Sequence, residues 1–342
     1  MSLLLKNKYV LLFVALLAVS SSAWVVRLLP ELSATTIAFW RMFLASLMAF
    51  AVSYKTILTF VPNKKILLAG IFLGFHFALF FRSVQLTSIA EAALLGTIAP
   101  VFTEFYSIMF QKKGFSIKVF FGLSLALLGA YTLISQSSFS DTSTYGNLLA
   151  VLCSVAMAVV LLVGKDVRKN VSLFEYSRWL FLYAAACLFL ISLYQNVSIF
   201  SFSVSDFGWF VFLAAVPTMV GHNIFYFLVK TLSATTVAAV PLGEPVISSF
   251  GAFFLFNEPV SLFVFLGGSS TVPPCGSTGC SALKSTSSSD DGCGCALGCA
   301  TSRSPLARGD SFVWDSAAAL LVPSGTMSMC GLIRDGPVGC NR

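Results

Sequence analysis

The residues of this sequence that could do chemistry lie inside long apolar runs. Glu244 stands near the middle of residues 231–260, directly before Pro245. An ionised carboxylate is costly in apolar surroundings, so it needs a function or a partner. Glu244 could carry a proton or meet a cationic substrate. The alternative is a structural hydrogen bond to a neighbouring helix.

Arg41 is a second charged residue within an apolar run, and Trp40 precedes it. A guanidinium recognises carboxylates well, so Arg41 could contact an anionic group of a substrate. The alternative is an ion pair with Glu91 that locks two helices together. Trp40 could line a pocket beside Arg41, or it could belong to the aromatic belt at a membrane surface.

Further polar residues and prolines mark places where helices could open onto a cavity. Three polar candidates lie deep within apolar runs: His76, His222 and Asn223. A lone histidine between helices more often makes a structural hydrogen bond than binds a ligand, so both interpretations stay open. Each of three prolines removes a backbone donor and is expected to break or bend its helix: Pro100, Pro217 and Pro245.

The apolar part of the chain lacks the residue patterns that catalysis needs. A metal-dependent transferase would use clustered aspartates, but Asp141, Asp166 and Asp206 each stand alone in a loop. Ser124, in the stretch GLSLA, lacks the closing glycine of a nucleophile elbow. No phosphate loop or nucleotide motif occurs. We therefore expect no enzyme, no catalytic residue, no cofactor and no metal site.

The composition indicates what surrounds these residues. Of the 342 residues, 57% are hydrophobic and only 10% are charged, and the mean hydropathy is +0.88. Soluble domains carry about 25% charged residues, so these charges are too few to cover a soluble surface. Apolar runs of about 20 residues indicate membrane-spanning helices rather than the short alternating strands of a barrel. The sequence therefore predicts an all-α polytopic membrane protein.

We place nine spans on the apolar runs, at residues 9–29, 34–53, 65–86, 88–110, 117–135, 146–164, 173–194, 207–229 and 233–256. If the N-terminus is cytoplasmic, the inside loops collect most of the Lys and Arg, and only Arg27 and Arg82 fall at outside ends. This asymmetry follows the positive-inside rule, so the net charge of +7 does not indicate nucleic-acid binding. A cleaved signal peptide is the rival interpretation of the N-terminus, but its apolar run continues through Trp24 to Val26.

Parts of the sequence occur twice. A shift of 145 residues, the separation of Pro100 and Pro245, also superposes Ser88 on Ser233, and a similar shift matches Trp40 with Trp179. We expect two repeats of five spans each, over residues 1–135 and 146–268. An odd number of spans makes the second repeat enter the membrane in the opposite sense, which is typical of transporters.

The sequence changes character after Gly268. Pro273 and Pro274 stand in what should be the third turn of a tenth span, so that span is expected to be incomplete. Residues 269–342 hold seven of the nine cysteines, all but Cys153 and Cys187, among many Ser and Gly. We expect a disordered, low-complexity tail outside the fold, such as a reading-frame change would produce. A metal or disulfide cluster is the alternative, but the tail has no histidine and no paired CxxC motif.

The two proline-containing spans, the second ending FFLFNEPVSLFVFLGG, and the Arg41 span before them resemble the EamA branch of the drug/metabolite transporter superfamily. The resemblance covers residues 1–268, although the first repeat has Lys113 and Gly114 where the second has the acidic motif Glu258 and Pro259. It implies a carrier of the bacterial inner membrane that exports amino acids or related small metabolites by alternating access through a central cavity.

Two other functions stay open beside that implication. Related branches of the superfamily carry nucleotide sugars or phosphorylated sugars, and a truncated membrane protein would carry nothing. The expected partners are a small-molecule substrate and the lipid bilayer, with no nucleic acid. A homodimer is left open.

Overall fold

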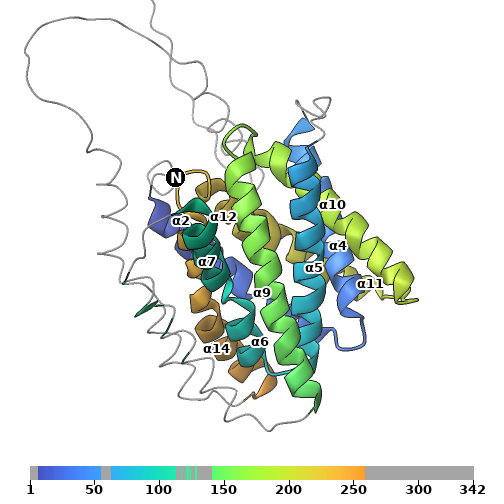
Figure 1. The fold of residues 1–342 in the computed structure, drawn as a ribbon. Coiled ribbons are helices and arrows are strands. Elements are labelled where there is room, and N and C mark those ends of the chain that lie inside the picture. The colour runs from blue at the N-terminus through green and yellow to red at the C-terminus, as the bar shows by residue number, and fades with distance from the viewer. Residues whose placement is uncertain are drawn as a thin grey trace, which may run out of the picture. The chain divides into compact units, whose positions relative to one another are not determined.

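A computed structural model describes residues 7–54, 63–112, 117, 121–122, 124, 128 and 141–258. Throughout these residues the regular structure is helical (Figure 1). Eight helical stretches among them are long and apolar enough to cross a membrane, with mean hydropathies of 1.4 to 2.5. They coincide with the predicted spans, apart from residues 117–135, which are mostly outside the described part. The all-α polytopic fold is thus confirmed for the described residues, and the incomplete tenth span and the tail lie outside them.

The helices follow one another in two series along the chain. The first series comprises α2 (Lys8–Ser20), α3 (Ser22–Leu28), α4 (Ala34–Val52), α5 (Lys64–Leu86), α6 (Ile89–Gly96) and α7 (Ala99–Gln111). The second comprises α9 (Asp141–Val167), α10 (Leu173–Tyr194), α11 (Val204–Leu213), η2 (Ala214–His222), α12 (Asn223–Leu228), α13 (Ala234–Ala239), η3 (Val240–Gly243) and α14 (Glu244–Phe256).

Serine side chains define where several of these helices begin. The hydroxyl of Ser88 accepts the backbone N–H of Glu91 at 3.2 Å, and that of Ser233 accepts the N–H of Thr236 at 2.9 Å. Such caps satisfy donors that the first helical turn leaves without partners. The two spans that begin at these caps also end alike, because Lys112 after α7 and Asn257 after α14 adopt left-handed backbone angles, with φ of 51° and 54°. Both pairs are separated by the 145 residues that relate Pro100 to Pro245.

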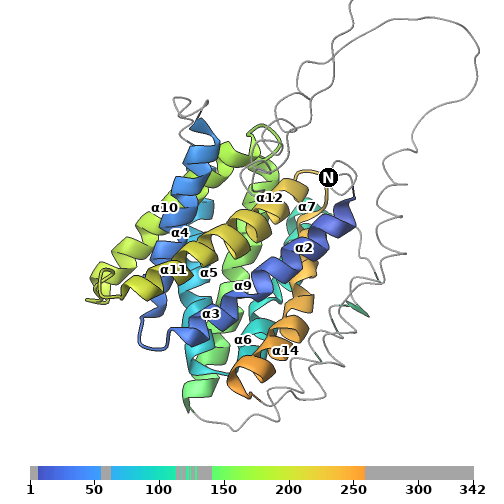
Figure 2. The ribbon, with the colours of Figure 1, turned by 180° about the vertical axis from the view of Figure 1, so that it is seen from behind.

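Close helix contacts hold the bundle together. Helix α5 packs against α9 on one side and α10 on another, and α10 also packs along α4 (Figure 1). A Cβ atom added to Gly70 of α5 would lie 2.5 Å from the Cβ of Tyr183 in α10. Small residues allow such close approach between membrane helices. In Figure 2, which shows the bundle from behind, the first span crosses in front as α2 and α3, beside α14.

Three spans lose regular α-helical geometry near a proline. The span of α6 and α7 is interrupted at Thr97 and Ile98, just before Pro100. Because proline has no N–H, the carbonyl one turn before it, that of Gly96, needs another donor. The thiol of Cys153 in α9 lies 3.8 Å from this carbonyl, and the hydroxyl of Ser154 donates to the neighbouring carbonyl of Leu95 at 2.6 Å. Helix α9 therefore stabilises the interruption.

The second and third irregular spans lie in the later half of the chain. In the span from α13 to α14, the short 3-10 segment η3 separates the two helices; Pro241 lies within η3 and Pro245 is the second residue of α14. In the span from α11 to α12, the middle segment η2 is a π-helix that contains Pro217. Irregular backbone inside a membrane is tolerated where it is buried in protein or lines a cavity. These segments are therefore where a cavity is expected.

Candidate functional site

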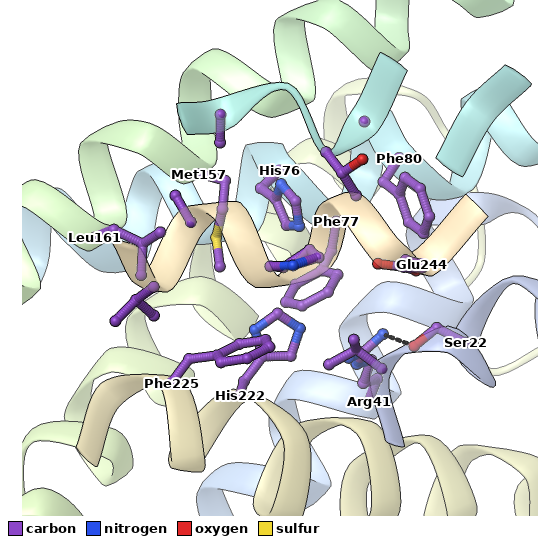
Figure 3. A pocket seen from close by; sticks show the side chains of 17 residues that line it. Ser22, Arg41, His76, Phe77, Phe80, Met157, Leu161, His222, Phe225 and Glu244 are labelled. Atoms are coloured by element: carbon purple, nitrogen blue, oxygen red, sulfur yellow. Dashed lines mark hydrogen bonds between the residues drawn. The ribbon is translucent and has the colours of Figure 1, made fainter. Parts of the chain in front are cut away.

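A cavity with an empty volume of about 580 Å³ lies where the interrupted helices meet. Its lining comes from the first span, from α4, α5, α6, α7, α9, η2 and α12, and from the residues around η3. The polar and charged side chains on its wall are Ser22, Arg41, His76, Thr97, His222 and Glu244. Most of the remaining wall is apolar, with aromatic rings prominent. Figure 3 shows Arg41, His76, His222 and Glu244 turned into the same space.

Arg41 is fully buried and held from several directions. Its Nε donates to the hydroxyl of Thr218 at 2.7 Å, and its Nη1 donates to the hydroxyl of Ser22 at 3.1 Å. The guanidinium carbon lies 4.1 Å from the centre of the Phe77 ring, which adds a cation–π contact. The remaining nitrogen, Nη2, has no hydrogen-bond partner among the described residues. The alternative ion pair with Glu91 is not formed within the described structure.

Glu244 is the first residue of α14 and is only 6% exposed. Its carboxylate lines the cavity and makes no hydrogen bond or ion pair within the described part of the chain. The positive charge of Arg41 attracts the Glu244 carboxylate electrostatically. The structural hydrogen bond considered from the sequence is therefore not found among the described helices, and the carboxylate is available to a molecule in the cavity.

The two histidines differ in what holds them. Nδ1 of His76 lies 3.0 Å from the carbonyl oxygen of Cys153, which can only accept, so Nδ1 carries a proton. His76 therefore makes the interhelical hydrogen bond that is common for a membrane histidine. Nδ1 of His222 has no partner in the described residues, and its ring packs edge-on against Phe77 at 5.2 Å. The two imidazoles lie 6.5 Å apart and both line the cavity.

Trp40 and Asn223 lie outside this cavity, although the sequence made them candidates for its wall. The indole Nε1 of Trp40 donates to the carbonyl of Ile199 at 2.7 Å, and its ring joins an aromatic cluster with Phe202 at 5.3 Å. The side-chain oxygen of Asn223 accepts a hydrogen bond from the hydroxyl of Ser177 at 2.5 Å, between α12 and α10. Both side chains turn away from the cavity because the rotation of their helices directs them to other neighbours. The prediction of a span does not give this rotation.

Two buried arginines were not identified as candidates from the sequence. Arg178 is fully buried in the second turn of α10, where its Nη1 donates to Ser53 at 3.3 Å and its guanidinium lies 5.6 Å from the Phe50 ring. Arg168 follows α9 and donates from Nε to the carbonyl of Tyr226 at 3.2 Å. The rule that singled out Arg41, a charge within an apolar run, would also have found Arg178. Neither arginine lines the cavity.

Sequence reasoning also did not identify Thr218 and Ser22, the two residues that accept hydrogen bonds from Arg41. Both are hydroxyls that bind Arg41, and both are at most 3% exposed. Their only sequence signal is polarity within a span, which many packing residues share. The described residues contain no group of three or more His, Cys, Asp and Glu that could hold a metal ion.

Comparisons with known proteins find similar transporters. A family model described as the EamA-like transporter family matches residues 7–135 and again residues 144–272. An uncharacterized transporter of Archaeoglobus fulgidus is 25% identical over 207 residues, which cover 60% of this chain and 73% of the relative. The uncharacterized transporter YyaM of Bacillus subtilis is 24% identical over 204 residues, covering 58% of this chain and 66% of the relative.

A solved crystal structure also shares the fold. It superposes with a TM-score of 0.63 over 78% of this chain and 94% of its own, at 16% sequence identity. At a sequence identity this low, the similarity shows a shared fold and nothing about function.

Proposed function

Because the chain belongs to the EamA-like transporter family, we propose that it exports amino acids with apolar side chains from a bacterial cell. The family match makes the chain a multi-pass membrane transporter and not an enzyme. The substrate class rests on the chemistry of the cavity. The direction follows the expectation that the family resemblance gave.

One observation carries the substrate class: a buried cation and a buried anion face one cavity. Arg41 offers Nη2, a charged donor without a partner among the described residues, and Glu244 offers a carboxylate that is equally without one. An amino acid is a zwitterion, so its carboxylate matches Arg41 and its ammonium matches Glu244. Each end of the substrate would then replace the water that a buried charge otherwise needs.

The rest of the wall suits an apolar side chain. Phe77, Phe80, Leu161 and Phe225 line the cavity, together with other apolar residues.

Phosphorylated sugars and nucleotide sugars fit the same wall less well. Their phosphate groups carry one or more negative charges, and Arg41 is the only Lys or Arg in the described lining. Glu244 would repel a phosphate placed beside it. Transport of these sugars in place of amino acids is therefore the alternative outcome of the counterflow experiment.

Several features support the proposed arrangement in the membrane. Two inverted five-helix repeats would open the cavity alternately to the two sides of the membrane. The two matches of one family model support this repeat. The serine caps and left-handed helix ends at corresponding positions also support it. A cytoplasmic N-terminus in a bacterial inner membrane is supported by the distribution of Lys and Arg.

Counterflow in proteoliposomes tests the substrate class. Vesicles that contain the purified protein and are preloaded with unlabelled L-leucine are expected to accumulate radiolabelled L-leucine. 4-Methylpentanoate, which lacks the ammonium, and L-leucinamide, which lacks the carboxylate, are expected to compete at least about tenfold more weakly, equivalent to about 1.4 kcal/mol. Protein-free vesicles are the control. Counterflow of glucose 6-phosphate or UDP-glucose without counterflow of any amino acid would overturn the proposal.

The direction has its own measurement. Right-side-out and inside-out membrane vesicles are loaded with L-leucine, and its release or uptake is followed under an imposed gradient. Net movement from the cytoplasmic to the outer face supports export. Net movement only toward the cytoplasmic face would make the protein an importer.

A further inference from the structure

We infer that Thr218, presented by the π-helical segment η2, is a positioning residue that aims the Arg41 guanidinium at the carboxylate of the substrate. The inference rests on the proposed function, because it assigns the residue that sets recognition at the same site. The contacts that carry it run from Pro217 through Thr218 to the guanidinium of Arg41.

Pro217 changes the backbone around it. An α-helix would place the N–H of residue 217 against the carbonyl of Leu213, but proline has no N–H. The hydroxyl of Thr218 donates to that carbonyl at 2.8 Å. The wider π-helical turn continues to its end, where the N–H of Asn223 bonds to the carbonyl of Thr218, five residues earlier. Pro217 and η2 thus bring the Thr218 hydroxyl into the interior.

The direction of the Thr218 hydroxyl follows from that contact. A hydroxyl has one proton and two lone pairs. Because the proton of Thr218 is donated to Leu213, the oxygen can only accept from another group. It accepts from Nε of Arg41 at 2.7 Å, and Thr218 is completely buried, so the contact is shielded from water. A charge-assisted bond of this kind is stronger than a bond between neutral groups.

Thr218 is one of three constraints on the guanidinium. Ser22 accepts from Nη1 at 3.1 Å, and the Phe77 ring lies under the plane at 4.1 Å. A planar group fixed at two nitrogens and one face cannot turn. Nη2 is then the nitrogen left without a partner among the described residues, on a side chain that lines the cavity. Without Thr218, Arg41 would keep only Ser22 as a hydrogen-bond acceptor and could swing toward Glu244, to which it is attracted.

Thr218→Val tests this role, because valine keeps the shape of threonine and removes the hydroxyl. We expect the KM for L-leucine to rise about tenfold, equivalent to about 1.4 kcal/mol, while the maximal rate changes little. Thr218→Ser restores the hydroxyl and is expected to return the KM to near the wild-type value. The matched control is Thr235→Val, which removes a hydroxyl that donates to Glu104 at 3.0 Å outside the cavity.

A double-mutant cycle separates positioning from a general structural effect. In the background Arg41→Gln, the substitution Thr218→Val is expected to add no further loss, because its target is already gone. An unchanged KM in Thr218→Val would overturn the inference. So would a loss of the same size in the Arg41→Gln background.

A substrate-free measurement keeps the inference separate from the proposed function. In protein carrying isotope-labelled arginine, the Nε–H resonance of Arg41 is assigned by its loss in Arg41→Gln. We expect slow exchange of this proton with water in wild type and in Thr218→Ser, and faster exchange in Thr218→Val. Equal exchange in all three proteins would refute the role of Thr218. Absence of amino-acid transport by the wild type, with the exchange pattern as expected, would instead refute only the proposed substrate.

Discussion

Glu244 and Arg41 place opposite charges at one buried cavity (Figure 3). Ionised groups within a membrane are costly and persist where they pair, line an aqueous cavity or act on a substrate. Here the two side chains attract each other, but no ion pair joins them in the described structure. Each keeps hydrogen-bonding capacity for a ligand. His222 adds a third polar group with a free Nδ1 among the described residues.

The substitution Glu244→Gln tests the anionic half of the site. Glutamine keeps the size of the side chain but can neither hold a charge nor exchange a proton. We expect the KM for L-leucine to rise about tenfold or more, since the ammonium of the substrate loses its counter-charge. We also expect net transport to lose its response to an imposed pH gradient.

The control for this variant is Glu104→Gln, because Glu104 is a half-buried carboxylate on α7 outside the cavity. Proteoliposome assays at several external pH values measure both the KM for L-leucine and the response of transport to the pH gradient. Full-rate transport by Glu244→Gln with unchanged pH dependence would contradict a proton role for this residue.

Among the helical elements, η2 is the one whose irregular geometry bears most directly on the site. Its nine residues contain Pro217, Thr218 and His222, which are all buried, and it packs against both α2 and α4. π-Helical turns are less favourable than α-helical ones and occur often at functional sites. The segment that carries this local cost also supplies the contact between Thr218 and Arg41.

The substitution Pro217→Ala tests this trade-off between stability and binding. Alanine restores the missing N–H, so we expect η2 to relax toward α-helix and the protein to unfold at a higher temperature in detergent. Because Thr218 would then turn away from Arg41, we expect weaker leucine binding in the same variant. Pro30→Ala, at a proline in a loop between spans, is the control. A variant with wild-type affinity would show that η2 is not needed for recognition.

Helices α5 and α10 provide a second test at the level of elements. The added methyl of Gly70→Ala would meet the Cβ of Tyr183 at 2.5 Å and the carbonyl of Leu180 at 3.0 Å. Neither atom is the end of a flexible side chain, so the helices must separate. We expect a destabilisation of about 1–3 kcal/mol, seen as a lower midpoint of thermal unfolding. Gly208→Ala, where nothing lies within 4 Å of the added atom, should unfold at nearly the wild-type temperature.

Across the whole molecule, contacts at one end of the bundle join segments far apart in sequence. Arg27, at the end of the first span, pairs with Glu258 at 3.0 Å and donates to the carbonyl of Thr87 at 2.8 Å. Glu258 also accepts the N–H of Ile89 at the start of α6, at 3.2 Å. Nearby, Trp24 donates to the carbonyl of Ser248 at 2.8 Å. A carrier that exposes its cavity at this end must loosen these contacts.

Breaking the ion pair is therefore expected to open this end more often. Both side chains are about one quarter exposed, at 26% and 25%, so the pair is partly screened. Its loss in Arg27→Gln should contribute at most about 1 kcal/mol, or about a fivefold change in population. Labelling of Thr97→Cys, a cavity-lining position, by a charged thiol reagent should quicken by a similar factor, as followed by mass spectrometry of that peptide.

The charge-exchanged double variant, Arg27→Glu with Glu258→Arg, controls for nonspecific damage. It is expected to label at close to the wild-type rate, since it rebuilds the pair. If Arg27→Gln also labelled at the wild-type rate, the ion pair would have no part in closing this end.

Much of this fold was accessible from the sequence, and the reason is physical. Apolar runs of membrane length must form helices, since hydrocarbon offers no partner for backbone groups. The predicted spans therefore agree with the observed ones to within a few residues wherever the structure describes them. Charges inside such runs are rare enough to find by inspection, which is why Arg41 and Glu244 could be singled out. Arg178 satisfied the same rule and was missed.

From the sequence alone one obtains a set of membrane helices with a few buried charges and prolines at known depths. Which of these residues meet depends on how the helices pack. Arg41, His76, His222 and Glu244 share one cavity, whereas Trp40 and Asn223 face other helices. Hydropathy gives the depth of a residue but not the rotation of its helix, which depends on packing against every neighbour. The contact between Thr218 and Arg41, 177 residues apart, arises from that packing and from the π-helical turn at Pro217.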